Sequence, residues 1–134
     1  MSGYRYLYVE DEPLNREVMQ TLLLEVIGVG ELITFADSAD FIARLKALDP
    51  LPDFVLLDVQ VAPHDGHAML AMIRADDATK HLKTLAVSAG LMPHRLAQYR
   101  AAGFDGVIAK PLDMMTFPDI IRRLEGGESV WQVE

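Results

Sequence analysis

Five short runs of apolar residues recur along the chain, and segments with helical spacing separate them. The runs are YRYLYV at 4–9, ELITF at 31–35, DFVLLDV at 53–59, LKTLAVSA at 82–89 and GVIAK at 106–110. Their apolar residues are continuous rather than alternating, which is typical of strands that are covered on both faces. The sequence therefore predicts five strands of a parallel sheet.

Between these runs, apolar residues spaced three or four positions apart predict helices. The stripes are Leu14, Val18, Leu22 and Val26 with Leu23 and Ile27 beside them, then Phe41, Ile42, Leu45 and Leu48, then Met69, Leu70 and Ile73, and finally Phe117, Ile120, Ile121 and Leu124. The expected boundary residues are Pro13 in the first turn of the first helix, Asp65-Gly66 at the start of the third, Pro93 and Gly103 around the fourth, and Asp113 as the N-cap of the fifth.

The alternation of strands and helices predicts an α/β fold. It implies a doubly wound, five-stranded parallel sheet of the flavodoxin-like kind, with right-handed crossovers and helices on both faces. Ligands of such sheets bind beyond the carboxyl ends of the strands, where the strand order reverses. In the order 2-1-3-4-5, strands one, three and four lie together at the centre. Residues that end these strands are therefore expected to meet in one pocket.

The residues at these strand ends have a consistent chemistry. Glu10 and Asp11 follow the first run, and Asp58, Ser88 and Lys110 lie at the ends of the third, fourth and fifth. Two carboxylates about 4 Å apart repel by roughly 4 kcal/mol at an effective dielectric constant near 20, so a proton or a cation must relieve the charge. Oxygen ligands without His or Cys favour Mg²⁺. An Asp, a divalent cation, a Lys and a hydroxyl are the groups that phosphoryl transfer requires.

Composition narrows the class of protein. A length of 134 residues suits one domain, and a hydrophobic content of 51% excludes a disordered chain. The net charge of −8 would repel a phosphate backbone, so we expect no direct nucleic-acid binding. Cys is absent, which excludes disulfides and thiolate chemistry. Because no apolar run approaches the ~20 residues of a membrane span and the N-terminus lacks a secretory signal, we expect a cytoplasmic protein without membrane contact.

Two other motifs do not predict a ligand. His64 and His67 are three positions apart, but a zinc site needs three or four ligands of the nitrogen or sulfur type, so we interpret them as solvent-exposed. Gly28 and Gly30 hint at a dinucleotide-binding loop. They follow a helical stripe rather than a strand and lack the third glycine of that motif.

The strand-end residues resemble those of response-regulator receiver domains of bacterial two-component signalling, over about residues 4–125. That family has an acidic pair after strand one, a phosphorylated Asp within D-x-x-M-P-x-x-D-G, a Ser or Thr ending strand four, and Lys-Pro after strand five. The matching residues are Glu10 and Asp11, Asp58 in DVQVAPHDG, Ser88 in AVSAG, and Lys110-Pro111. The likeness is to single-domain, chemotaxis-regulator-like members. It implies a receiver domain over 1–125 and a short C-terminal tail, 126–134, without an output domain.

The resemblance implies a role for each matching residue. Asp58 is expected to be the phosphoacceptor, and Mg²⁺ is expected to bind Asp11, Asp58, the backbone carbonyl of Gln60 and, through water, Glu10. Ser88, Ala89 and Lys110 are expected to surround the phosphoryl group. Ser88 and Val107 occupy the switch positions, and the Lys110–Pro111 peptide bond is expected to be cis.

The resemblance also implies partners. The phosphoryl group would come from a sensor histidine kinase or a phosphotransfer protein. The signal would pass to a downstream protein, or to a second copy, through the face formed by the fourth helix, fifth strand and fifth helix. The domain would catalyse only its own phosphorylation and dephosphorylation. Two alternatives remain open: a pseudo-receiver that binds partners without phosphorylation, and a haloacid-dehalogenase-like phosphatase, whose second Asp is Gln60 here.

Two departures from the family pattern affect these expectations. Val61-Ala62 replaces Met-Pro after the acceptor, and the proline is displaced to Pro63. Val107 replaces the aromatic switch residue. A β-branched side chain has few χ1 options and no ring to move, so we expect the response to reach the face around Val107 less than in relatives that carry the aromatic. Other side chains, Tyr99 among them, could take over this role from another position.

Overall fold

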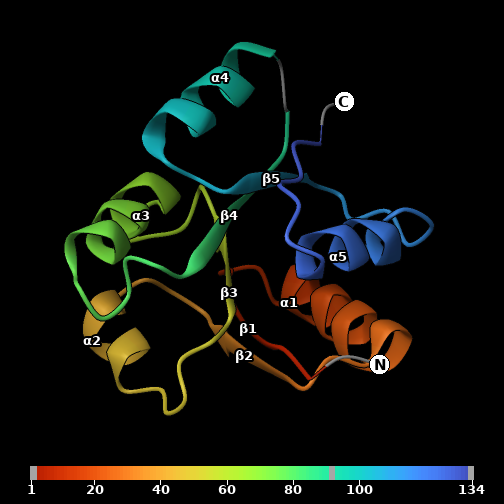
Figure 1. Ribbon diagram of the computed structural model, residues 1–134, viewed down its shortest axis with the longest axis horizontal. Coiled ribbons are helices and arrows are strands. Elements are labelled where there is room, and N and C mark those ends of the chain that lie inside the picture. The colour runs from red at the N-terminus through yellow and green to blue at the C-terminus, as the bar shows by residue number, and fades with distance from the viewer. Residues whose placement is uncertain (1–2, 91–92, 133–134) are drawn as a thin grey trace.

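A five-stranded parallel sheet forms the centre of the protein, which we describe from a computed structural model covering residues 3–90 and 93–132 (Figure 1). The strands are β1 (Arg5–Val9), β2 (Glu31–Phe35), β3 (Phe54–Asp58), β4 (Lys83–Ser88) and β5 (Gly106–Ala109). Their order is β2-β1-β3-β4-β5, and all neighbours are parallel. The predicted fold class and strand order are confirmed.

Helices cover both faces of this sheet. They are α1 (Pro13–Gln20), continued by a π-helix (Thr21–Ile27), then α2 (Phe41–Lys46), α3 (Gly66–Ala75), α4 (Pro93–Ala102) and α5 (Phe117–Glu125). In Figure 1, α1 and α5 lie on one side of the sheet, and α2 and α3 lie on the other, followed by α4. Within the described part of the chain, no helix combines the length and the apolar character that a membrane span requires.

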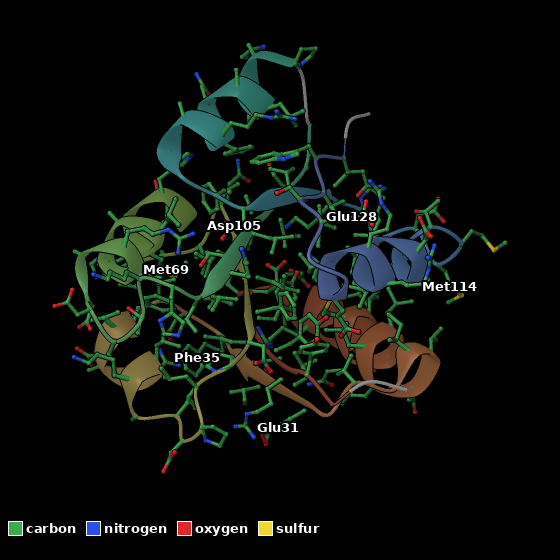
Figure 2. The ribbon with its side chains drawn as sticks, viewed as in Figure 1. Glu31, Phe35, Met69, Asp105, Met114 and Glu128 are labelled. Atoms are coloured by element: carbon green, nitrogen blue, oxygen red, sulfur yellow. The ribbon has the colours of Figure 1, made fainter. Side chains whose placement is uncertain are left out.

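Successive residues of each strand face opposite cores, which explains why the apolar runs are continuous. In β1, Tyr6 and Tyr8 pack with the residues of α1 and α5, whereas Leu7 and Val9 pack on the other face. Figure 2 shows Phe35 and Met69 on that second face, which α2 and α3 cover. All of the β1 side chains from Tyr6 to Val9 are fully buried.

The first helix buries only part of its predicted apolar stripe. Leu22 and Leu23 are buried, but Leu14 is 63% exposed and Val26 is 49% exposed. A step of four residues advances roughly 40° beyond a full turn of an α-helix, so such a stripe rotates away from the sheet. The wider turn of the π-helix changes the register further. Leu14 and its neighbours line an open hollow of about 380 Å³ against the β5–α5 loop.

The helix boundaries agree with the predicted signals, with one exception. Asp65 caps α3, since its carboxylate accepts a hydrogen bond from the Ala68 N–H at 2.8 Å. The prediction that Asp113 caps α5 is wrong, because the helix begins at Phe117. Asp113 instead organises the preceding turn, where its side chain accepts from the Met115 N–H at 2.8 Å. Pro118 explains the late start, because proline is accepted in a first helical turn but not further in.

The segment after α5 lies along the free edge of β5. The Val107 N–H donates to the Val130 carbonyl at 2.7 Å, and the Gln132 N–H donates to the Val107 carbonyl at 3.1 Å. The Trp131 ring lies against α4, with the Arg100 guanidinium 4.5 Å from its centroid. Residues 130–132 therefore extend the sheet beside β5, whereas residues 133–134 of the predicted tail lie outside the described residues.

A substitution at Gly106 tests how closely residues 130–132 pack against β5. A Cβ at this position would lie 2.5 Å from the Val130 carbonyl oxygen, a backbone atom that cannot rotate away. We expect Gly106→Ala to displace residues 130–132 and to lower the free energy of unfolding by roughly 1–3 kcal/mol, measured by urea denaturation. Trp131 is the only tryptophan, so its fluorescence should shift to the red.

Gly3→Ala is the matched control, because no atom lies within 4 Å of a Cβ built there. It should change neither the unfolding curve nor the spectrum. Equal stability and equal Trp131 emission in the two variants would contradict the tight contact between Gly106 and Val130.

Candidate functional site

Three carboxylates converge at the carboxyl end of the central strands. Glu10 and Asp11 follow β1, and Asp58 ends the adjacent strand β3. One oxygen from each carboxylate lies within 4.8 Å of the others. Glu10 and Asp58 are 1% and 3% exposed, whereas Asp11 is exposed to solvent. The structure thus brings together the three acids that the sequence placed at neighbouring strand ends.

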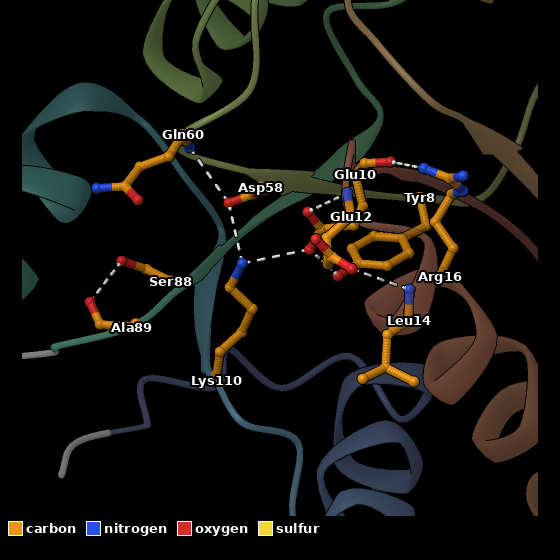
Figure 3. Close-up of polar contacts among 10 residues, drawn as sticks. All are labelled: Tyr8, Glu10, Glu12, Leu14, Arg16, Asp58, Gln60, Ser88, Ala89 and Lys110. Atoms are coloured by element: carbon orange, nitrogen blue, oxygen red, sulfur yellow. Dashed lines mark hydrogen bonds and ion pairs between the residues drawn. The ribbon is translucent and has the colours of Figure 1, made fainter.

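Lys110 supplies a positive charge to this cluster from the end of β5. Its Nζ lies 3.2 Å from Glu10 Oε1 and 3.3 Å from Asp58 Oδ1 (Figure 3). Burial opposes the charge on Lys110, but the negative charges of Asp58 and Glu10 outweigh it and raise the pKa of the amine. The Lys110–Pro111 peptide bond is cis, the isomer that the family resemblance implies.

The two buried carboxyls differ in their affinity for a proton. Burial is the largest effect on Asp58 and, together with the neighbouring Glu10, raises its pKa to about 6. Burial also opposes ionisation of Glu10, but contacts with Asp58, Tyr8 and the Glu12 N–H lower the pKa of Glu10 below its usual range. Without a cation, the pair therefore retains a proton on Asp58 in mildly acidic solution.

Several groups hold Glu10 in place. The Tyr8 hydroxyl donates to Glu10 Oε1 at 2.9 Å, and the Glu12 N–H donates to Oε2 at 3.3 Å. Arg16 donates to the Glu10 carbonyl at 2.8 Å. Burial raises the pKa of Tyr8 far above its usual value, so this hydroxyl stays protonated and acts as a donor.

The apolar run 4–9 predicts Tyr8 only as a core residue. A usable signal was present, because residues two apart on a strand share a face and Tyr8 precedes Glu10 by two. Arg16 had no comparable signal, since its contact depends on how α1 packs.

The remaining predicted site residues lie around this cluster, and Gln60 contacts it through its backbone. The Gln60 N–H donates to Asp58 Oδ1 at 3.2 Å, and Figure 3 shows the Gln60 side chain directed away from the carboxylates. Ser88 is buried at the end of β4, and its hydroxyl donates to the Ala89 carbonyl at 3.1 Å. Val107 is fully buried in β5. Of the predicted residues, Glu10, Asp58 and Lys110 are thus joined through their side chains, and Gln60 contacts Asp58 through its backbone N–H.

The cluster has the composition of a site for a hard cation. Its ligand atoms are carboxylate oxygens, without nitrogen or sulfur donors, and Lys110 contacts two of the three acids, Glu10 and Asp58. Mg²⁺ favours such oxygen ligands and keeps several waters. The exposure of Asp11 leaves one side of the cluster open to solvent. The residues present therefore fit a magnesium ion.

Comparison with known proteins gives matches over most of the chain. The family model described as "Response regulator receiver domain" matches residues 6–122. "Two-component response regulator ORR41" of Oryza sativa subsp. japonica is 32% identical over 109 residues, which cover 81% of this chain and 84% of that protein.

A second relative and a solved structure from other organisms also match the chain. "Stress response regulator protein 1" of Meyerozyma guilliermondii is 29% identical and aligns with 84% of this chain. The chain spans about half of that protein's length, 51%. Among solved structures, the receiver domain of the sensor histidine kinase PA1611 from Pseudomonas aeruginosa superposes with a TM-score of 0.77. It covers 92% of this chain and 98% of that one at 24% identity, a level that shows the shared fold.

The pKa of Asp58 leads to a test in metal-free buffer with a chelator. Its pKa is raised to about 6 in the folded protein, so the stability that protonated Asp58 contributes is present below about pH 4 and lost as the pH rises to about 6. Asp58→Asn removes this loss. We compare the free energy of unfolding of Asp58→Asn with that of the parent protein. The difference, variant minus parent, should be roughly 2 kcal/mol larger at pH 7.5 than at pH 4.

Asp77→Asn serves as the control, because that side chain is 96% exposed. Its difference from the parent should not change with pH. A difference for Asp58→Asn that is equal at both pH values would contradict the raised pKa. Adding Mg²⁺ at pH 7.5 should stabilise the parent and have less effect on Asp58→Asn.

Proposed function

Because the chain belongs to the response regulator receiver domain family of two-component signalling, we propose that it accepts a phosphoryl group on Asp58 and signals by changing conformation. The observation that supports this most directly is the contact of buried Asp58 with Lys110, at 3.3 Å, within a cluster of three carboxylates. A nucleophile, a cation site and a fixed positive charge meet there, as phosphoryl transfer requires.

In the proposed reaction, the Asp58 carboxylate attacks the phosphorus of the donor. An Asp58 oxygen–phosphorus bond forms as the bond from phosphorus to the donor's nitrogen or oxygen breaks. Asp58 must be ionised to act, and its pKa of about 6 makes loss of the proton accessible near neutral pH. Lys110 already lies beside Asp58 Oδ1 and would pair with the oxygens of the transferred group.

Magnesium is part of this proposal. Asp11, Asp58 and the Gln60 carbonyl would hold the ion, with Glu10 acting through water, and bound Mg²⁺ would neutralise charge on the phosphoryl oxygens. The donor set of this chain supports the assignment. The structure of the PA1611 receiver domain is described with a magnesium ion coordinated in its active site cleft.

Ser88 and Ala89 are proposed to contact the transferred phosphoryl group from the end of β4. The register pairs Asp58 with Val87, which places Ser88 one residue further along the adjacent strand. A phosphoryl oxygen would offer the Ser88 hydroxyl a charge-assisted hydrogen bond, stronger than its present bond to a neutral carbonyl. Ala89 is small and leaves room for the group.

The proposed donor is a sensor histidine kinase or a phosphotransfer protein. The proposed output surface is formed by α4, β5 and α5, through which the domain would contact a downstream protein or a second copy. Residues 130–132 occupy part of this surface, because they pair with β5 and contact α4. Nothing in the site favours an external phosphatase substrate, since Gln60 has no acidic proton to donate.

Phosphorylation can be tested with acetyl phosphate and Mg²⁺. Intact mass should show one added phosphoryl group, and peptide mapping should place it on Asp58. A chelator should prevent labelling. Asp58→Asn should abolish it, and Asp77→Asn should not. Labelling that persists unchanged in Asp58→Asn would refute the assignment of the acceptor.

Metal binding provides a separate test by calorimetry. Asp11→Asn removes a carboxylate of the cluster, so the dissociation constant for Mg²⁺ should rise at least about tenfold. Glu12→Gln is the matched control, because Glu12 is the next acid in the chain and lies outside the cluster. Equal losses in the two variants would indicate a general effect of charge rather than a defined site.

A further inference from the structure

The Ser88 hydroxyl is held by a side chain from α4. The Tyr99 hydroxyl lies 3.0 Å from Ser88 Oγ, and both residues are buried. Ser88 has one proton, which it donates to the Ala89 carbonyl, an atom that can only accept. Tyr99 is therefore the donor in its bond with Ser88. Figure 3 shows Ser88 reaching toward Ala89, on the side away from Lys110.

The Tyr99 ring is fixed by two neighbouring aromatic side chains. It stacks on His67 of α3, with centroids 5.4 Å apart, and meets the edge of Phe104 at 5.7 Å. Only 3% of Tyr99 is exposed. A ring confined in this way cannot follow Ser88 over a distance unless α4 moves with it.

The next residue of α4 contacts the C-terminal segment. Arg100 lies over the Trp131 ring at 4.5 Å, and the backbone on either side of Trp131 is hydrogen-bonded to Val107. Consecutive residues of one helix therefore connect the Ser88 hydroxyl to the segment that covers β5. Val107 itself is buried beneath this segment and has no ring to move.

We propose that Tyr99 is the positioning residue that couples Ser88 to α4 and to residues 130–132. In the unphosphorylated protein, Tyr99 and Ala89 hold the Ser88 hydroxyl away from Asp58. When Ser88 turns to donate to a phosphoryl oxygen, the bond from Tyr99 is lost, and α4 changes its contact with Trp131. This inference rests on the proposed phosphorylation of Asp58 and assigns its readout to a residue of α4 rather than to Val107.

The test measures binding of beryllofluoride, a phosphoryl mimic, with Mg²⁺ in four proteins: the parent, Tyr99→Phe, Ser88→Ala and the double variant. Tyr99→Phe keeps the ring but removes the bond that opposes movement of Ser88. We expect its affinity to rise about fivefold, the equivalent of one neutral hydrogen bond. In the Ser88→Ala background, the same substitution should have no effect, because its partner is absent.

Trp131 fluorescence supplies the second readout, since it is the only tryptophan. Beryllofluoride should change its emission in the parent protein, and less in Tyr99→Phe, where α4 is already released. If Tyr99→Phe does not fold, Ser88→Ala still decides the matter. It should bind beryllofluoride without the Trp131 response, and a full response in Ser88→Ala would overturn the proposal.

Tyr4→Phe is the matched control, because it removes a hydroxyl whose contact is with the Glu125 carbonyl, away from Ser88. It should leave the affinity unchanged. An unchanged affinity in Tyr99→Phe, or an equal change with and without Ser88, would overturn the coupling. Binding of beryllofluoride that depends on Asp58 in the parent protein would still support the proposed function. A parent protein that binds no beryllofluoride and takes up no phosphoryl group would overturn both.

Discussion

Like charges buried at one point are the constraint on which the site depends. Glu10 and Asp58 are almost inaccessible to solvent, and Asp11 adds a third carboxylate within 4.8 Å. A single lysine cannot balance three acids, so the cluster must keep a proton or bind a cation. Burial of Asp58, together with the neighbouring Glu10, raises the pKa of Asp58 in the metal-free protein. The same imbalance supports the proposal that the site binds Mg²⁺ and then accepts a phosphoryl group.

The sheet makes such a cluster possible. Its parallel strands all end at one edge, so an acid after β1, an acid at the end of β3 and a lysine after β5 meet without any long loop. Hydrogen bonds from Tyr8, Arg16 and backbone N–H groups then fix the acids against their repulsion. These donors are neutral or act on the backbone carbonyl, so Lys110 is left as the cation that faces the two buried carboxylates.

The far side of the site has a different construction. Ser88 is not in contact with the acids but is held by Tyr99, which α3 and Phe104 keep in place. The segment 130–132 lies on β5 and against α4, next to the same helix. The helix α4 therefore connects Ser88 to the proposed output surface, of which it forms a part. A ring on α4 provides a connection that Val107, as a buried β-branched residue, does not.

Local patterns in the sequence determined the strands, the helices and the chemistry of the strand ends, because burial on both faces and helical spacing are properties of neighbouring residues. Glu10, Asp58 and Lys110 were predictable for this reason: each follows an apolar run whose end had to lie at one edge. Only the tertiary structure decided the rest. The exposure of Leu14, the Ser88–Tyr99 bond and the docking of Trp131 depend on distances between segments far apart in sequence, which no local pattern encodes.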